Sequence, residues 1–200
     1  MQFQKNNTQQ KFENKHYLPI YFNQVLNDDQ INMIHEIAKT NSFVPAQTGG
    51  GEDGNVNLGV RRSTVAWLDF NKIDKSILEF FQNLFIEANE LGFKFDLSGY
   101  ETIQYTVYEE SNAGEYKWHT DTMFLQNNEV RKLSMSLLLS DPSEFEGGKL
   151  LLNPDGNIVV AEERKGRAFF FPSWMPHCVT PVIKGTRKSL VIWAHGPRFK

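Results

Sequence analysis

Three side chains of the types that bind transition metals occur in a widely spaced pattern, His119-x-Asp121 and His177. Two imidazoles and one carboxylate can form the facial triad that holds a non-haem ferrous ion and leaves three coordination positions open. In an extended segment, residues two apart point to the same face, so His119 and Asp121 can reach one ion while Thr120 points away. The short HxD pattern alone more often marks two unrelated polar residues. The sequence therefore predicts a metal site only if His177 joins the pair.

His177 begins a segment that reads as a short strand, directly after the turn-rich residues 171–176. Taken alone, a histidine here would more often be half-buried and bind no metal. Cys178 alternates to the opposite face of the strand, where we expect a small buried side chain and not a ligand. His177 is thus placed at the mouth of a strand, where it can complete the site.

Arg187 lies ten positions after His177 and opens the next predicted strand, residues 187–195. The two-residue period of a strand places five residues on one face: Arg187, Ser189, Val191, Trp193 and His195. A guanidinium on a partly apolar face needs an anionic partner, and its planar fork matches a carboxylate. Without the metal pattern, a solvent-exposed arginine would be the more usual interpretation. His195 lies roughly 25 Å along the strand at ~3.3 Å per residue, too far to reach the same ion.

The order and spacing of these residues resemble those of the Fe(II)- and 2-oxoglutarate-dependent dioxygenases. The residues that carry the resemblance are His119, Asp121, His177, Arg187 and Ser189. Four further stretches are similar to the prolyl 4-hydroxylase-like branch, which includes bacterial and viral prolyl hydroxylases and the PKHD-type hydroxylases: 116–119, 137–142, 145–150 and 165–172. The similarity covers about residues 58 to 194.

The resemblance implies a role for each residue. Three residues would ligate Fe(II): His119, Asp121 and His177. Arg187 would pair with the distal carboxylate of 2-oxoglutarate, and Ser189 and Trp193 would lie beside this co-substrate. The implied reaction uses O2 and couples oxidative decarboxylation of 2-oxoglutarate to hydroxylation of a C–H bond, first of all in a prolyl residue of a peptide or protein. Ascorbate is a further cofactor that the resemblance allows.

Tyr108 matches the family tyrosine that hydrogen-bonds the same carboxylate, although the loop 109–115 looks longer than usual. Alternation favours Tyr108 over Tyr105, because Tyr108 shares a strand face with Gln104 and Thr106. That polar face suits a co-substrate pocket. An ordinary solvated strand face is the alternative.

Other functions stay open at this point. The substrate could be a free amino acid or another small molecule, and a metal-binding jelly roll without catalysis is a different class. Arg187 with Ser189 argues against the latter, because a protein that only binds metal needs no carboxylate clamp. Repair of alkylated nucleic acid is disfavoured by the net charge of −3 and the absence of basic clusters, so we expect no nucleic-acid partner.

The composition fits one globular domain, since 200 residues with 40% hydrophobic side chains can build a large core. We expect residues 1–15 to form a disordered tail and 16–200 a single oxygenase domain. A single cysteine excludes an intrachain disulfide, and no segment reads as a membrane span or a signal peptide. A cytoplasmic protein without a membrane partner is therefore expected.

The expected fold is mainly β, with N-terminal helices packed on one sheet of a core that resembles a double-stranded β-helix, or jelly roll. One helix would be capped by Asp28 or Asp29, and a longer one would begin at Asn71 and end at Gly92. Later alternation predicts strands with a hairpin at 153–157.

The glycine-rich loop 46–59 is predicted to close over substrate, with a plain surface loop as the alternative. His16 and His35 have no predicted role and are interpreted as solvent or core histidines.

Overall fold

The computed structural model describes residues 17–49 and 54–199. The predicted tail 1–15, His16 and part of the predicted lid therefore lie outside the described residues. The extent of the domain stays a prediction. Within the described ranges, no helix is both long and apolar enough to span a membrane.

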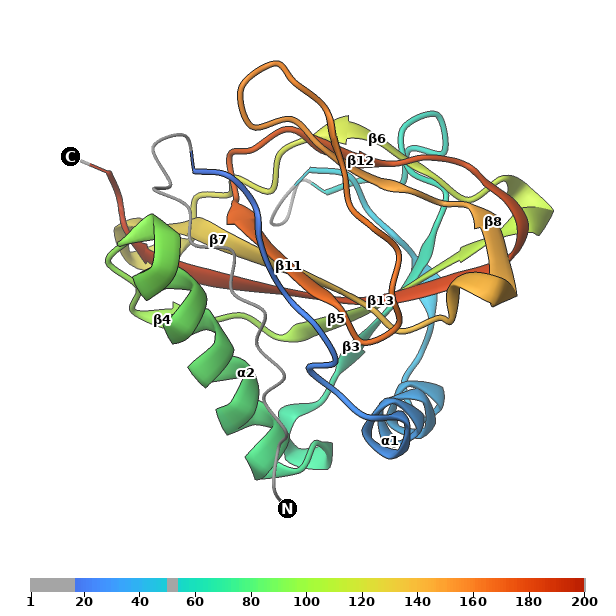
Figure 1. Ribbon diagram of the computed structural model, residues 1–200, viewed down its shortest axis with the longest axis horizontal. Helices are drawn as coiled ribbons and strands as arrows, with labels where there is room; N and C mark the ends of the chain where they lie inside the picture. Colours follow the sequence, from blue (N-terminus) through green and yellow to red (C-terminus); the bar gives the residue numbers. More distant parts are fainter. Residues whose placement is uncertain (1–16, 50–53, 200) are drawn as a thin grey trace.

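The described residues form two antiparallel sheets (Figure 1). The larger sheet has the strand order β1-β11-β7-β13-β5-β3-β2, with β4 and β8 also paired to β13. Its strands are β1 (Ile20–Phe22), β2 (Val44–Pro45), β3 (Thr64–Leu68), β4 (Gly99–Tyr100), β5 (Ile103–Glu109), β7 (Glu129–Leu138), β8 (Phe145–Gly147), β11 (Ala168–Pro172) and β13 (Val182–Pro197). The smaller sheet has the order β10-β9-β12-β6. Its strands are β6 (Tyr116–His119), β9 (Leu150–Leu152), β10 (Val159–Val160) and β12 (His177–Val179).

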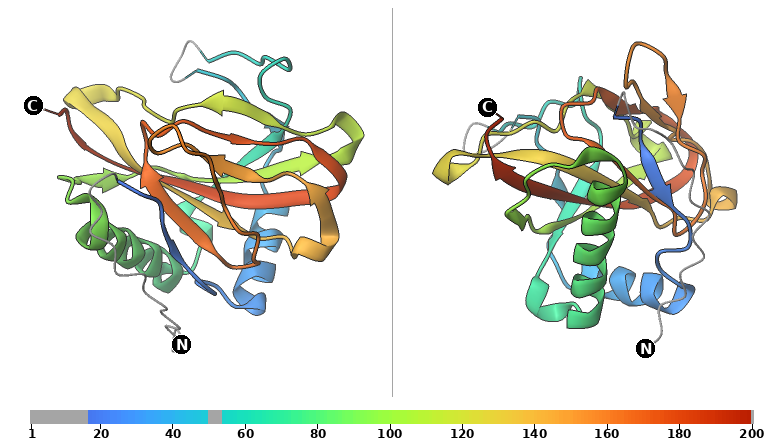
Figure 2. Two further views of the ribbon diagram at one scale, coloured as in Figure 1. Left: turned by 45° about the horizontal axis from the view of Figure 1, so that its top comes forward. Right: turned by 60° about the vertical axis from the view of Figure 1, so that its left-hand side comes forward.

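Two helices cover the face of the large sheet that points away from the small one, α1 (Asp28–Lys39) and α2 (Lys75–Ala88) (Figures 1 and 2). The main core lies between these helices and the sheet. It includes Ile34, Phe85, Met135, Leu190 and Ile192, all at most 3% exposed. Burying a side chain of this size stabilises the fold by roughly 1.5–3 kcal/mol. The predicted arrangement, helices packed on one sheet of a jelly roll, is confirmed.

Strand β13 runs through the middle of the large sheet, paired with β7 on one side and β5 on the other. Its Leu190 and Ile192 belong to the helix-covered core, so the alternate residues face the small sheet. A rigid central strand thus carries the predicted co-substrate residues between the two sheets. The predicted hairpin at 153–157 is also confirmed, because β9 and β10 pair across this turn.

The predicted helix starts were wrong by a few residues. Asn27 caps α1: its side chain accepts from the backbone N–H of Gln30, whose side chain accepts from the N–H of Asn27, both at 2.9 Å. This reciprocal capping box makes Asp28 the first residue inside the helix.

Helix α2 begins at Lys75, not after Asn71, because Asp74 accepts from the N–H of Ser76. The preceding residues, Phe70–Lys72, form a separate 3-10 turn. At the other end a π turn, Asn89–Phe93, extends the helix past Gly92. The left-handed residue that ends it is Lys94, at φ 55°, so a lysine takes the position expected for glycine.

Candidate active site

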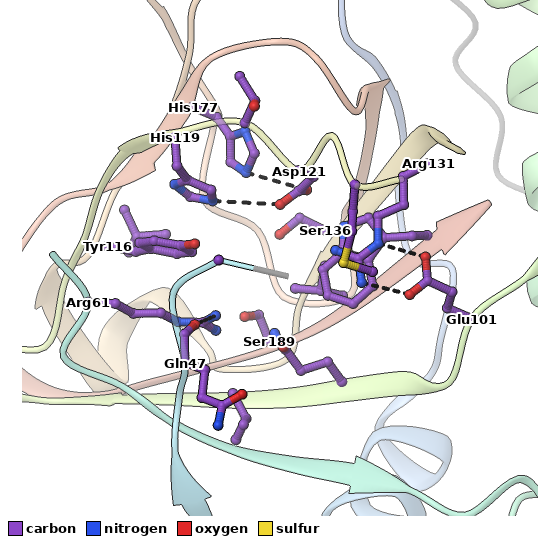
Figure 3. Close-up of a pocket in the computed structure, with 18 of the residues that line it drawn as sticks. Gln47, Arg61, Glu101, Tyr116, His119, Asp121, Arg131, Ser136, His177 and Ser189 are labelled. Carbon is purple, nitrogen blue, oxygen red and sulfur yellow. Dashed lines mark hydrogen bonds and ion pairs between the residues drawn. The ribbon is translucent and has the colours of Figure 1, made fainter. Parts of the chain in front are cut away.

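The three predicted metal ligands converge between the two sheets (Figure 3). His119 ends β6 and His177 begins β12, and the two residues face each other in the strand register. Asp121 follows β6 by two residues. Its Oδ1 lies 3.7 Å from Nε2 of His119, and its Oδ2 lies 3.5 Å from Nε2 of His177. All three ligand atoms lie within 4.8 Å of one another, so a single ion can contact them all.

Backbone carbonyls fix which nitrogen each imidazole offers. Nδ1 of His119 lies 2.8 Å from the carbonyl oxygen of Lys117, and Nδ1 of His177 lies 3.0 Å from that of Met175. A carbonyl oxygen only accepts, so each Nδ1 carries the proton and donates it. Each Nε2 therefore presents its lone pair to the centre of the site, as metal ligation requires.

The electrostatics of the site favour the ligating forms of His119 and Asp121. Burial and the neighbouring His177 lower the pKa of His119 to about 3, so this imidazole is neutral at physiological pH. Burial alone would raise the pKa of Asp121, but the imidazoles of His177 and His119 and the hydrogen bonds from Trp193 and Ser134 together lower it. A neutral imidazole and a carboxylate are donors that suit Fe(II).

The triad lines a cavity of about 760 Å³, and Arg187, Ser189 and Trp193 also line it. Arg187 is 4% exposed, and Nη1 donates to Oγ of Ser189 at 3.1 Å. No carboxylate of the described residues lies within ion-pair distance of this guanidinium. Burial lowers the pKa of Arg187. A buried cation without an anionic partner is costly, so the cavity is built to receive an anion.

Tyr108 lies beside Arg187 in the strand register, with the guanidinium carbon 5.6 Å from the centre of its ring. Gln104, Thr106 and Tyr108 are all at most 4% exposed, so the alternative of a solvated strand face was wrong. Tyr105 points to the opposite face, and its hydroxyl lies 2.9 Å from Nδ1 of His35. Of the two tyrosines, Tyr108 is the one that lines the cavity.

Trp193 also lines the cavity, and its buried indole nitrogen makes no hydrogen bond of ordinary geometry among the described residues but lies close enough to Asp121 to help lower the pKa of that carboxylate. The guanidinium of Arg131 stacks on this ring at 3.9 Å and forms two hydrogen bonds of 2.6 Å with Glu101. The Arg131–Glu101 pair was not predicted from the sequence. The indole N–H thus acts on the metal-binding carboxylate, and Arg187 is the group that fits a polar co-substrate.

Two further residues, to which the sequence interpretation gave no role, lie next to the metal site. The ring of Tyr116 stacks on His119, with ring centres 3.4 Å apart, and the guanidinium of Arg61 lies 4.5 Å from the centre of the Tyr116 ring. Strict alternation would put Tyr116 and His119 on opposite faces of β6. A register shift between β6 and β12 brings both into the cavity.

The other histidines and the predicted lid can be placed in part. His195 pairs with Glu129, Nδ1 to Oε2 at 2.7 Å, and does not line the cavity that contains the triad. Gln47, Gly49 and Val56 border the cavity from the described parts of the loop 46–59. Closure of this loop over a substrate stays a prediction.

Comparisons with known proteins agree with this geometry. Residues 103–195, which include all three triad residues and Arg187, match the model of the 2OG-Fe(II) oxygenase superfamily. This part of the chain, 93 of its 200 residues, is similar to the 2OG-Fe(II) oxygenases. The superfamily implies Fe(II), 2-oxoglutarate and O2 as the reagents of the site. These are the reagents of the Fe(II)- and 2-oxoglutarate-dependent dioxygenases, which this part of the chain resembles.

The curated relatives that match this chain are hydroxylases, and it spans less than half of their length. A PKHD-type hydroxylase of Synechococcus sp. (strain CC9605) is 40% identical over 85 residues, 42% of this chain but only 38% of that relative. A prolyl-4-hydroxylase of Pseudomonas putida superposes with a TM-score of 0.69 at 21% identity, over 89% of this chain and 92% of that one. A prolyl hydroxylase of Trichoplax adhaerens, solved with a hypoxia inducible factor peptide, superposes with a TM-score of 0.69 at 18% identity, over 90% of this chain and 84% of that one. These likenesses confirm the double-stranded β-helix fold.

Proposed function

We propose that this oxygenase hydroxylates a prolyl residue in a peptide or protein and couples that step to oxidative decarboxylation of 2-oxoglutarate. The observation that carries the proposal is the presence, in one cavity, of the triad and a buried arginine that forms no ion pair with a carboxylate of the described residues. The prolyl hydroxylase folds of the structural neighbours, one solved with a peptide, support the substrate class.

The residues of the cavity would have separate roles in the proposed reaction. His119, Asp121 and His177 would hold Fe(II), which supplies the redox chemistry that joins decarboxylation to C–H hydroxylation. Arg187 would grip the distal carboxylate of 2-oxoglutarate through its planar fork. Tyr108 would donate its phenolic hydrogen to the same carboxylate.

Burial of the residues around Arg187 supports the same proposal. Ser189 and Trp193 would lie along the co-substrate, which would displace water from the buried guanidinium and the indole N–H. Excluding water strengthens each of these polar contacts and keeps the co-substrate in one orientation.

The substrate class is tested by turnover with proline-containing peptides. The protein is incubated with Fe(II), 2-oxoglutarate, ascorbate and a peptide library, and succinate and peptide mass are measured. We expect succinate to form in step with a mass gain of one oxygen atom on proline, and the matching alanine peptides to stay unmodified. Oxidation of free proline or of another small molecule, with every peptide left unchanged, would replace the peptide proposal by the small-molecule one.

A further inference from the structure

Asp121 is held by groups that do not touch the centre of the metal site. Oγ of Ser134 donates to Oδ2 of Asp121 at 2.8 Å. Oγ of Ser134 also lies 3.0 Å from Oγ of Ser173. The backbone N–H of Asp121 donates to the carbonyl oxygen of Ser173 at 2.8 Å. Ser173 thus contacts the ligand's backbone directly and its carboxylate through Ser134.

The direction of this chain of hydrogen bonds follows from counting protons. A carboxylate only accepts, so Ser134 uses its single hydroxyl hydrogen on Asp121. The contact between the two hydroxyl groups must then be donated by Ser173 and accepted by Ser134. The hydrogen bonds therefore run from Ser173 to Ser134 to Asp121, and each makes the next donor stronger.

Both serines come from rigid, fully buried positions. Ser134 lies in the middle of β7, opposite Trp193 on β13 and Phe171 on β11, and it is 0% exposed. Ser173 follows β11 directly, is also 0% exposed, and donates its N–H to the carbonyl oxygen of Lys132 at 2.9 Å. Burying a hydroxyl group destabilises the fold unless the group is hydrogen-bonded. Here the hydrogen bonds of both hydroxyl groups connect them to the carboxylate of Asp121.

The turn that contains Ser173 also orients the second histidine of the triad. It leads from β11 to β12, and the carbonyl oxygen of Met175 accepts the Nδ1 hydrogen of His177. One short turn therefore sets the position of Asp121 and the ring orientation of His177. Neither Ser134 nor Ser173 lines the cavity.

We propose that Ser134 and Ser173 are positioning residues that occupy Oδ2 of Asp121 and leave Oδ1 free for the ion. This inference rests on the proposed role of the triad as the Fe(II) site. A carboxylate held in this way binds through one oxygen, which keeps a coordination position available for co-substrate and O2. Without the Ser134 hydroxyl, the carboxylate can turn and present both oxygens to the ion.

The test uses the metal-free protein and Co(II), whose visible absorption reports on coordination number. Ser134→Ala, Ser173→Ala and the double variant are titrated with Co(II), and their urea unfolding is measured. The matched control is Ser140→Ala, because Ser140 is 1% exposed, donates to the carbonyl oxygen of Thr186 and accepts from the N–H of Lys188. This control removes an equally buried hydroxyl that has no contact with the triad.

We expect Ser134→Ala to weaken Co(II) binding by about 10–100-fold and to change the spectrum, as losses behind a metal ligand commonly do. Ser173→Ala should give a smaller loss, and the double variant should resemble Ser134→Ala, since the Ser173 hydroxyl acts through Ser134. Ser140→Ala should lower the free energy of unfolding and leave the affinity and spectrum unchanged.

Unchanged Co(II) affinity and spectrum in folded Ser134→Ala would overturn the inference. If that variant does not fold, Ser173→Ala decides in its place, and unchanged binding by Ser173→Ala would have the same consequence. Wild-type protein that binds no Co(II) would instead overturn the proposed metal site, and this inference with it. The failure of the positioning role and that of the proposed function are therefore distinguishable.

Discussion

Replacement of His177 by alanine should remove Fe(II) binding and all hydroxylation. Among the described residues, His177 supplies one of the two imidazole nitrogens at the point where the ligand atoms meet, and Asp121 with His119 alone cannot form a facial triad. Replacing a residue that hydrogen-bonds a metal ligand commonly lowers metal affinity by about 10–100-fold. Loss of the ligand itself should therefore lower Fe(II) affinity by more than roughly 100-fold. Anaerobic titration of the metal-free protein with Fe(II) measures this directly.

The control for this variant is His195→Ala. His195 lies at the far end of β13, pairs with Glu129 and does not contribute to the triad. We expect it to bind Fe(II) like the wild type. Because His177 is 6% exposed, thermal unfolding of both variants must show a folded protein. A folded His177→Ala variant with wild-type Fe(II) affinity would remove His177 from the metal site.

Replacement of Arg187 by alanine should weaken 2-oxoglutarate binding far more than metal binding. Removing one partner of a buried, hydrogen-bonded charge pair costs about 2–5 kcal/mol, which is roughly 30-fold or more in the dissociation constant. The triad does not use Arg187, so Fe(II) affinity should change little. Titration of the metal-loaded variant with 2-oxoglutarate, beside titration of the metal-free variant with Fe(II), separates the two affinities.

Two further variants sharpen the Arg187 experiment. Arg187→Lys keeps the charge but loses the planar fork, so it should recover only part of the 2-oxoglutarate affinity. Lys188→Ala is the control, because Lys188 is the next residue along β13 and does not line the cavity. Equal losses of metal and co-substrate affinity in Arg187→Ala would contradict a role as carboxylate partner.

The parts of the site that could be predicted from sequence are those on regular strands. On β13 the period of two separates Leu190 and Ile192, in the helix-covered core, from Arg187 and Ser189, in the cavity. The sheet is paired on both sides there, so nothing disturbs the alternation. The pair His119 and Asp121 was predictable from its spacing alone, because Asp121 lies beyond the end of the edge strand β6.

The residues that escaped prediction depend on irregular or distant contacts. Tyr116 enters the cavity because of a register shift, which no local pattern announces. Glu101 and Arg131 are thirty residues apart and meet only after β4, β7 and β13 have assembled. The helix caps were misplaced because several neighbouring polar residues can cap, and only the hydrogen bonds made by Asn27 and Asp74 decide between them.

Anaerobic titration of the wild-type protein with Fe(II) and then 2-oxoglutarate tests the central claim most directly. Chelation of the ion by the co-substrate in this site gives a weak visible charge-transfer band. We expect the band to appear only when both are present, to saturate at one 2-oxoglutarate per chain, and to be absent from His177→Ala. A folded wild-type protein that binds Fe(II) but shows no band with 2-oxoglutarate would contradict the account.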